Sequence, residues 1–297
     1  MVLTKPSLKN TSRKIFVATP ESSANECCSC NFRERGLNAG LTLLPRSWSR
    51  QRRSAVTIGI AFGTLLLFLW GMATPMALLP EPIGSAAQQF ADGARITVQL
   101  TVVSGLIGIV LGMLAALGKL SRIFPLRWLA AFYIWVIRGT PLLVQVLFVF
   151  LALPAVVPGL QLSDFYSAVV ALSLNAGAYN AEAIRAGILA VHKGQTEAAR
   201  SLGLSGFQTF RDVVFPQSMR IALPPLVNNF ISLLKDSSLA YVIGVAELSN
   251  IGNRIQSVTF QPIPVFITVA SIYLILTSVM TQISGAIERQ LDVEHHP

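Results

Sequence analysis

The sequence contains six apolar stretches that are long enough to cross a lipid bilayer, which requires about 20 mostly apolar residues. These stretches cover residues 54–73, 94–118, 128–153, 166–191, 213–248 and 264–286. Polar residues interrupt the fifth stretch, so we expect a broken span there. Only 12% of the 297 residues are charged, whereas a soluble domain has about a quarter. The pattern predicts an all-α, polytopic membrane protein with about six transmembrane helices.

The basic residues are concentrated at the N-terminus. Ten of the 23 Lys and Arg residues lie before residue 54, so the net charge is not the basic face of a nucleic-acid-binding protein. Residues 1–53 are predicted to form a basic, poorly ordered cytoplasmic tail, and residues 291–297 a short cytoplasmic tail. The first apolar stretch is longer than the core of a signal peptide and lies far from the N-terminus. We therefore expect it to be retained as a span.

The sequence offers little for metal binding or catalysis. Cys27, Cys28 and Cys30 all lie in the tail and are too few for a four-ligand zinc site. The segment 112–120 resembles a P-loop only superficially, because its glycines are wrongly spaced and Leu120 replaces the magnesium-binding Ser or Thr. No Ser/His/Asp or Cys/His set is evident. We therefore expect no metal, no cofactor and no nucleotide site in this chain.

Glycines recur on one side of the second apolar stretch. Gly105, Gly108 and Gly112 are separated by three and four residues, so they share one face of a helix. Small residues at this spacing allow two membrane helices to approach closely. The pattern predicts a tightly packed helix pair.

The loop charges predict an orientation in the membrane. Loops 74–93 and 154–165 contain no Lys or Arg. Basic residues precede the first stretch and follow the second and fourth: Arg46, Arg50, Arg52, Arg53, Lys119, Arg122, Arg127, Lys193, Arg200 and Arg211. Because Lys and Arg remain on the cytoplasmic side, we expect both termini and the segment 192–216 to face the cytoplasm.

The segment after the fourth stretch is polar and has strong local signals. Thr196 is predicted to cap a short helix at 197–202, and Gly203 to adopt a left-handed conformation after it. Residues 205–208 fit a capping box that opens a second short helix, which Pro216 is expected to end. The segment is therefore predicted to form a two-helix elbow suited to docking.

The same segment resembles the EAA signature of ABC-importer permeases. The matching residues are Glu197-Ala198-Ala199, Gly203, Val213 and Phe215-Pro216. Val213 and Phe215 replace the usual Ile and Leu and keep their apolar character. Three further stretches resemble the polar amino acid (histidine/glutamine-type) branch: "RGTPLLVQ" (138–145), "NAGAYNAEAIRAGI" (175–188) and "LPPLVNNFISLLKDSSL" (223–239).

The resemblance implies a five-helix permease domain at residues 90–290, preceded by one extra span at 54–73. It implies that the chain is a subunit of an ATP-driven importer that moves polar amino acids across the bacterial inner membrane. The chain itself is expected to have no enzymatic activity. The implied partners are a separate ATP-binding subunit that holds ATP and Mg, a second permease chain, an extracytoplasmic solute-binding protein and membrane lipid. The residues implied to couple the chain to the ATPase are Glu197, Ala198, Ala199, Gly203, Phe207 and Pro216. The resemblance specifies neither the particular amino acid nor whether the two permease chains are identical.

Ionisable residues within the spans are candidate functional groups, because they are costly in a membrane. Glu182 and Arg185 share a helix face and form either a structural pair or a cavity wall. Lys235 and Asp236 break the fifth stretch as either a polar hinge or a substrate-binding wall, since half-helix ends suit charged ligands. The candidate substrate path comprises Asn175, Tyr179, Glu182, Lys235, Asp236 and Ser237.

An alternative function is a self-sufficient secondary transporter or channel for small polar solutes. In that case the segment 197–216 would be an ordinary loop. Inverted repeats would favour the alternative, and none is recognisable. A membrane-embedded enzyme is disfavoured because the sequence lacks a polar catalytic cluster.

Overall fold

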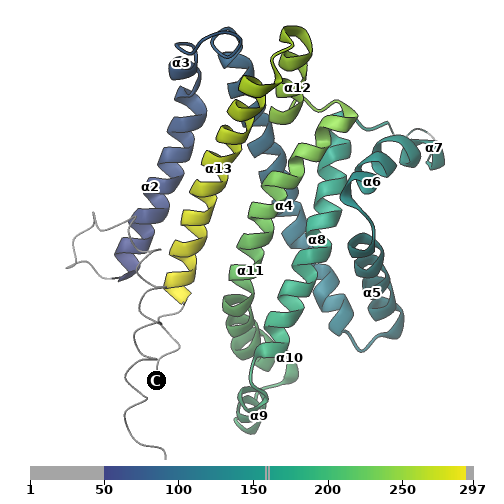
Figure 1. Ribbon diagram of the computed structural model, residues 1–297. Helices are drawn as coiled ribbons and strands as arrows, with labels where there is room; N and C mark the ends of the chain where they lie inside the picture. The colour runs from purple at the N-terminus through teal and green to yellow at the C-terminus, as the bar shows by residue number, and fades with distance from the viewer. Residues whose placement is uncertain (1–49, 158, 160, 292–297) are drawn as a thin grey trace, which may run out of the picture. The chain divides into compact units, whose positions relative to one another are not determined.

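The computed structural model describes residues 50–157, 159 and 161–291, and this part of the chain is helical without a strand (Figure 1). The expected all-α class is therefore confirmed. The described helices belong to one compact unit that begins at Arg50. Most of the predicted tail at 1–53, its three cysteines, and the C-terminal tail beyond 291 lie outside the described residues.

The helical elements range from single turns to helices of about 30 residues. In chain order they are α2 (Arg50–Gly71), α3 (Ala73–Met76), α4 (Ala87–Leu120), α5 (Phe124–Gly139), α6 (Leu142–Leu147), the π-helix η1 (Phe148–Ala152), α7 (Leu153–Val156), α8 (Asp164–Ala190), α9 (Lys193–Ser201), α10 (Gly206–Gln208), the π-helix η2 (Thr209–Val214), α11 (Phe215–Asp236), the 3₁₀-helix η3 (Ser237–Ile243), α12 (Leu248–Thr259) and α13 (Pro262–Leu291).

The number of spans is smaller than six when judged by length and composition. Among the described residues, α4 and the Pro262–Glu288 part of α13 are long and apolar enough to cross a membrane. A third span results if α5 and the following helical segment to Val156 count as one broken span, bent by 110°. The remaining expected spans are not confirmed, since α8 carries several polar side chains and the apolar part of α2, Val56–Gly71, is short.

The third apolar stretch is not the continuous helix that the sequence suggested. Thr140 has an extended backbone, with φ −117° and ψ 145°, and ends α5. Pro141 follows, and proline disfavours the α conformation in the residue before it. The helix therefore stops at Gly139 and resumes in a new direction at Leu142.

The expected close packing at the second stretch is confirmed. A Cβ atom added to Gly108 would lie 2.8 Å from Ala176 Cβ, and one added to Gly112 would lie 2.6 Å from Asn180 Cβ. These contacts join α4 to α8, and the two helices pack against each other (Figure 1). Gly105 faces the ring of Phe230 in α11. The glycines therefore bring the backbones of α4 and α8 close together.

The fifth apolar stretch is broken where the sequence predicted. The α-helix α11 ends at Asp236, and the chain continues as the tighter helix η3 until Gly244, which has φ 93°. The prediction that Pro216 ends a helix is wrong, because Pro216 lies in the first turn of α11. The π-helix η2 directly precedes it, so the helical chain passes through Pro216 instead of ending there.

The helix α12 begins at a buried carboxylate. Glu247 has no exposed surface, and its side chain accepts hydrogen bonds from the N–H groups of Ser249 and Asn250, both at 2.8 Å. The hydroxyl of Tyr273 in α13 donates to the same carboxylate at 2.9 Å. Glu247 therefore caps α12 and connects it to α13.

The extra N-terminal helix α2 lies along α13 (Figure 1). Leu65 and Leu69 of α2 are buried in a cluster with Leu276 of α13. Nε of Arg95 in α4 donates a hydrogen bond to the carbonyl of Leu69, at 3.1 Å. This helix is thus packed onto the bundle as an integral part.

Candidate functional site

A polar cavity of about 500 Å³ lies between the α5–α6 break, α8 and α11. This volume is typical of sites for small molecules. The cavity is lined by Thr140, Pro141, Leu142, Asn175, Ala176, Tyr179, Asn229, Ser232, Leu233 and Asp236. Three residues of the predicted substrate path, Asn175, Tyr179 and Asp236, therefore share one cavity.

Two other residues of the predicted path point elsewhere. Ser237 is fully buried, and its hydroxyl donates to the carbonyl of Leu234 at 2.8 Å. Lys235 lines a separate depression of about 340 Å³, together with Ser249 and Tyr273. Successive helical residues point about 100° apart, since one turn takes 3.6 residues. Neighbours in sequence at the end of α11 therefore face different surroundings.

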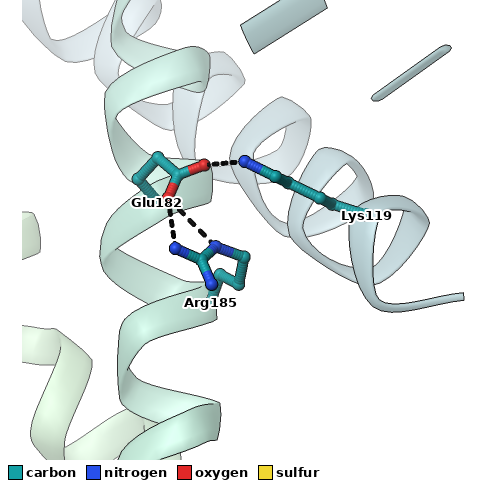
Figure 2. Close-up of polar contacts among 3 residues, drawn as sticks. All are labelled: Lys119, Glu182 and Arg185. Carbon is teal, nitrogen blue, oxygen red and sulfur yellow. Dashed lines mark hydrogen bonds and ion pairs between the residues drawn. The ribbon is translucent and has the colours of Figure 1, made fainter. Parts of the chain in front are cut away.

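Glu182 lies outside the cavity in a three-residue ion-pair cluster (Figure 2). Its carboxylate accepts hydrogen bonds from Arg185 at 2.8 and 3.0 Å, and from Lys119 at the end of α4. Figure 2 shows Lys119 and Arg185 approaching the carboxylate from different sides. This geometry agrees with the structural-pair reading of Glu182 and Arg185. Sequence reasoning missed Lys119, which is 63 residues away in the chain.

Arg138 lies over the ring of Tyr179, with 5.2 Å between its Cζ atom and the ring centroid. Arg138 belongs to the last turn of α5, whereas Tyr179 belongs to α8 and lines the cavity. A cation–π contact of this kind contributes roughly 0.5–2 kcal/mol, depending on its exposure. The contact connects α5 to α8 beside the cavity.

The α5–α6 break is held by Gln145, which sequence reasoning missed. Its side-chain nitrogen donates to the carbonyl of Ile137 at 2.7 Å, the carbonyl of Thr140 at 3.1 Å and the hydroxyl of Thr140 at 3.0 Å. Its side-chain oxygen accepts a hydrogen bond of 3.1 Å from Nδ2 of Asn175. The only sequence signal was a glutamine four residues after Pro141 in an apolar segment. Gln145 thus connects the break to a cavity-lining residue.

A second amide pair connects α11 to α8. Nδ2 of Asn229 donates to Oδ1 of Asn180 at 3.0 Å. Asn229 lines the cavity, whereas Asn180 is buried behind it. The cavity wall is therefore supported by side-chain amides on two sides. Among the described residues, no three His, Cys, Asp or Glu side chains come together to hold a metal ion.

The predicted elbow forms, with one change at its start. The first helix, α9, begins at Lys193 and is capped by His192, whose Nδ1 accepts a hydrogen bond from the N–H of Gly194 at 3.1 Å. The expectation that Thr196 caps this helix is wrong, because Thr196 lies within it. A histidine N-cap cannot be predicted from the sequence, because its ring nitrogen can accept a hydrogen bond only when it carries no proton.

The turn of the elbow agrees with the local sequence signals. Gly203 has φ 84°, the left-handed conformation expected of it. Ser205 and Gln208 form the expected capping box, with their side chains and backbone N–H groups bonded reciprocally. The second helix then continues through η2 into α11. The elbow is thus joined to α11 without a loop.

Most of the residues implied to contact an ATPase are exposed in this chain. Glu197, Ala198, Gly203, Phe207 and Pro216 lie on the surface. Exposed fractions of 72% for Phe207 and 84% for Leu202 mark an uncovered apolar surface. Ala199 is buried, with 4% exposed, and therefore packs inside the elbow.

Residues 108–293 match the family described as "Binding-protein-dependent transport system inner membrane component". The chain is 43% identical to the L-cystine transport system permease protein TcyB of Bacillus subtilis, over 68% of this chain and 86% of that protein. It is 40% identical to the glutamine transport system permease protein GlnP of Escherichia coli, over 68% and 92%.

Solved structures give the same fold. A crystal structure of an amino acid ABC transporter with histidines superposes with a TM-score of 0.66 and 41% identity, over 69% of this chain and 95% of that chain. An inward-facing MetNI methionine ABC transporter superposes with a TM-score of 0.60 over 72% and 99% of the two chains. Its identity of 21% indicates a shared fold alone.

Proposed function

Because the chain belongs to the family of binding-protein-dependent transport system inner membrane components, we propose that it is the permease subunit of an ATP-driven importer of polar amino acids in the bacterial inner membrane. Its relatives include permeases of cystine, arginine and glutamine transport systems. The observation that carries the proposal is a polar cavity and an exposed elbow on a chain about 40% identical to such permeases. The chain itself carries out transport and no covalent chemistry.

The elbow is the docking site for a separate ATP-binding subunit, which binds ATP and Mg. Glu197, Ala198, Gly203 and Phe207 are exposed and form the contact, with Pro216 at its edge. Ala199 has a supporting role, because it is buried within the elbow. The apolar exposed side chains fit a protein partner better than water.

The cavity holds the amino acid during its passage. Both long helices that line it, α8 and α11, lead directly toward the elbow. They are packed closely near that end, since a Cβ on Gly187 would lie 2.6 Å from the carbonyl oxygen of Ser218 and 3.0 Å from Ala222 Cβ. A displacement of the elbow by the ATPase therefore moves the cavity walls as a unit.

The remaining partners follow from the same assignment. A second permease chain, identical or related, completes the path, and an extracytoplasmic binding protein delivers the amino acid. The loop charges support an orientation with both termini and the elbow in the cytoplasm. Cystine, arginine and glutamine are the first substrates to test.

Reconstitution in proteoliposomes tests the proposal. The permease is combined with the ATPase and binding protein encoded beside it, and uptake of labelled arginine, glutamine and cystine is measured. We expect uptake of at least one amino acid that requires ATP and the binding protein. Uptake by the permease alone, driven by an ion gradient, would instead support the secondary-transporter alternative.

A further inference from the structure

We propose that Gln145 is a positioning residue that fixes the orientation of the Asn175 amide, so that the cavity presents oxygen acceptors to the ammonium or guanidinium group of the substrate. This inference rests on the proposed function, because it assigns a chemical preference to the same cavity. Gln145 itself is absent from the cavity lining and is 8% exposed. It therefore acts through Asn175.

The orientation of the Gln145 side chain follows from its fixed neighbours. The carbonyl groups of Ile137 and Thr140 can only accept hydrogen bonds, and both lie within 3.1 Å of the same side-chain atom. The Thr140 hydroxyl, 3.0 Å from that atom, donates its proton to the carbonyl of Val136 and is also an acceptor here. This side-chain atom of Gln145 must therefore be the amide nitrogen. The Gln145 oxygen consequently faces Asn175.

The orientation of Asn175 is then determined in turn. A glutamine oxygen accepts but cannot donate, so the atom of Asn175 that lies 3.1 Å away must be its nitrogen. The other amide atom, Oδ1, remains for the cavity. Among the described residues, no donor is bonded to it. Rotation of the Asn175 amide would place two oxygens against each other and leave both without a donor.

The rest of the lining adds further groups that accept hydrogen bonds. Asp236 contributes a carboxylate, and Asn229 contributes a side-chain amide that pairs with Asn180. No Lys or Arg belongs to the lining of this cavity: Arg138 lies beside it over the Tyr179 ring, and Lys235 lines a different depression. An ammonium group has donors only, and charge-assisted hydrogen bonds are the stronger ones. The Asp236 carboxylate and the Asn175 oxygen therefore favour the cationic end of a ligand.

Binding measurements on the permease co-purified with its ATPase in lipid nanodiscs test this role. The probes are L-arginine, L-glutamine and L-glutamate, measured by titration calorimetry. We expect arginine to bind about ten-fold or more tightly than glutamate, because a hydrogen bond to a charged group contributes roughly that factor. Gln145→Leu and Asn175→Ala should each weaken arginine binding about ten-fold. Gln256→Ala, on α12 and outside the cavity, serves as the matched control and should bind normally.

The double variant Gln145→Leu with Asn175→Ala separates positioning from a general structural role. If Gln145 acts through Asn175, the double variant binds arginine no more weakly than Asn175→Ala alone. Additive losses, or glutamate binding as tight as arginine binding in the wild type, would overturn the inference while leaving the permease assignment intact. If the wild type binds none of the three amino acids, both the cavity assignment and this inference fail.

Discussion

Substitution of Gly203 separates the docking of the ATPase from the folding of the permease. Gly203 has φ 84°, and a Cβ atom built on it meets no other atom within 4 Å. A side chain there costs only the strain of the left-handed backbone, roughly 1–2 kcal/mol. Typical folding free energies are about 5–15 kcal/mol, so the variants should remain folded. A docking partner, in contrast, would meet the new side chain directly.

A series of three substitutions at this position distinguishes strain from bulk. Gly203→Ala adds the strain but little volume, whereas Asn tolerates the left-handed conformation better and adds bulk. Gly203→Asp adds a charge as well. We expect Gly203→Ala to retain most of the ATPase, and the Asn and Asp variants to bind at least ten-fold less, a loss of about 1.4 kcal/mol. Glu197→Lys should weaken docking by under about 1 kcal/mol, the usual contribution of an exposed ion pair.

The assay is recovery of the co-expressed ATPase with affinity-tagged permease at matched membrane levels. Fluorescence-detected size-exclusion chromatography of each variant controls for folding. Amino acid uptake should fall in parallel with ATPase recovery across the series. Wild-type recovery of the ATPase with Gly203→Asp would refute the docking assignment of the elbow, and a loss with Gly203→Ala as large as with Gly203→Asn would refute the argument from bulk.

Three further outcomes are expected. Asp236→Asn keeps the volume of a cavity-lining side chain and removes its charge, so uptake should fall while ATPase recovery stays normal; normal uptake would exclude the carboxylate from substrate binding. A phosphatase reporter fused near Glu81 should be active and one fused near Gly206 inactive, and the reverse pattern would contradict the orientation. Glu247→Ala should lower the free energy of unfolding by about 1–3 kcal/mol, because it removes the cap of α12 and leaves two partly buried N–H groups without an acceptor. Thermal unfolding in detergent measures this loss, and an unchanged midpoint would contradict it.

Features that depend on a few adjacent residues could be predicted from the sequence. The left-handed Gly203 and the Ser205–Gln208 capping box are local patterns with a direct backbone meaning. The end of α11 at Asp236 follows from two charged residues in an apolar stretch. Close packing through Gly108 and Gly112 follows from the spacing of small residues.

Features that depend on partners distant in the chain could not be predicted in this way. The sequence left Glu182 open between a structural pair and a cavity wall, because its third partner, Lys119, comes from another helix. Lys235 and Asp236 are adjacent in sequence, but only the rotation of the helix decides which one faces the cavity. Gln145 has a role only because the chain bends at Thr140 and returns two carbonyl groups to it.

The change from α11 to η3 beside Asp236 has a mechanical consequence. A 3₁₀-helix rises about 2.0 Å per residue and an α-helix about 1.5 Å. Over the seven residues of η3, conversion to α-helix would shorten the segment by about 3.5 Å while keeping the backbone hydrogen-bonded. The segment η3, which connects the cavity-lining end of α11 to α12, can therefore change its length by this amount in one step. Such a change would not expose unpaired peptide groups to lipid.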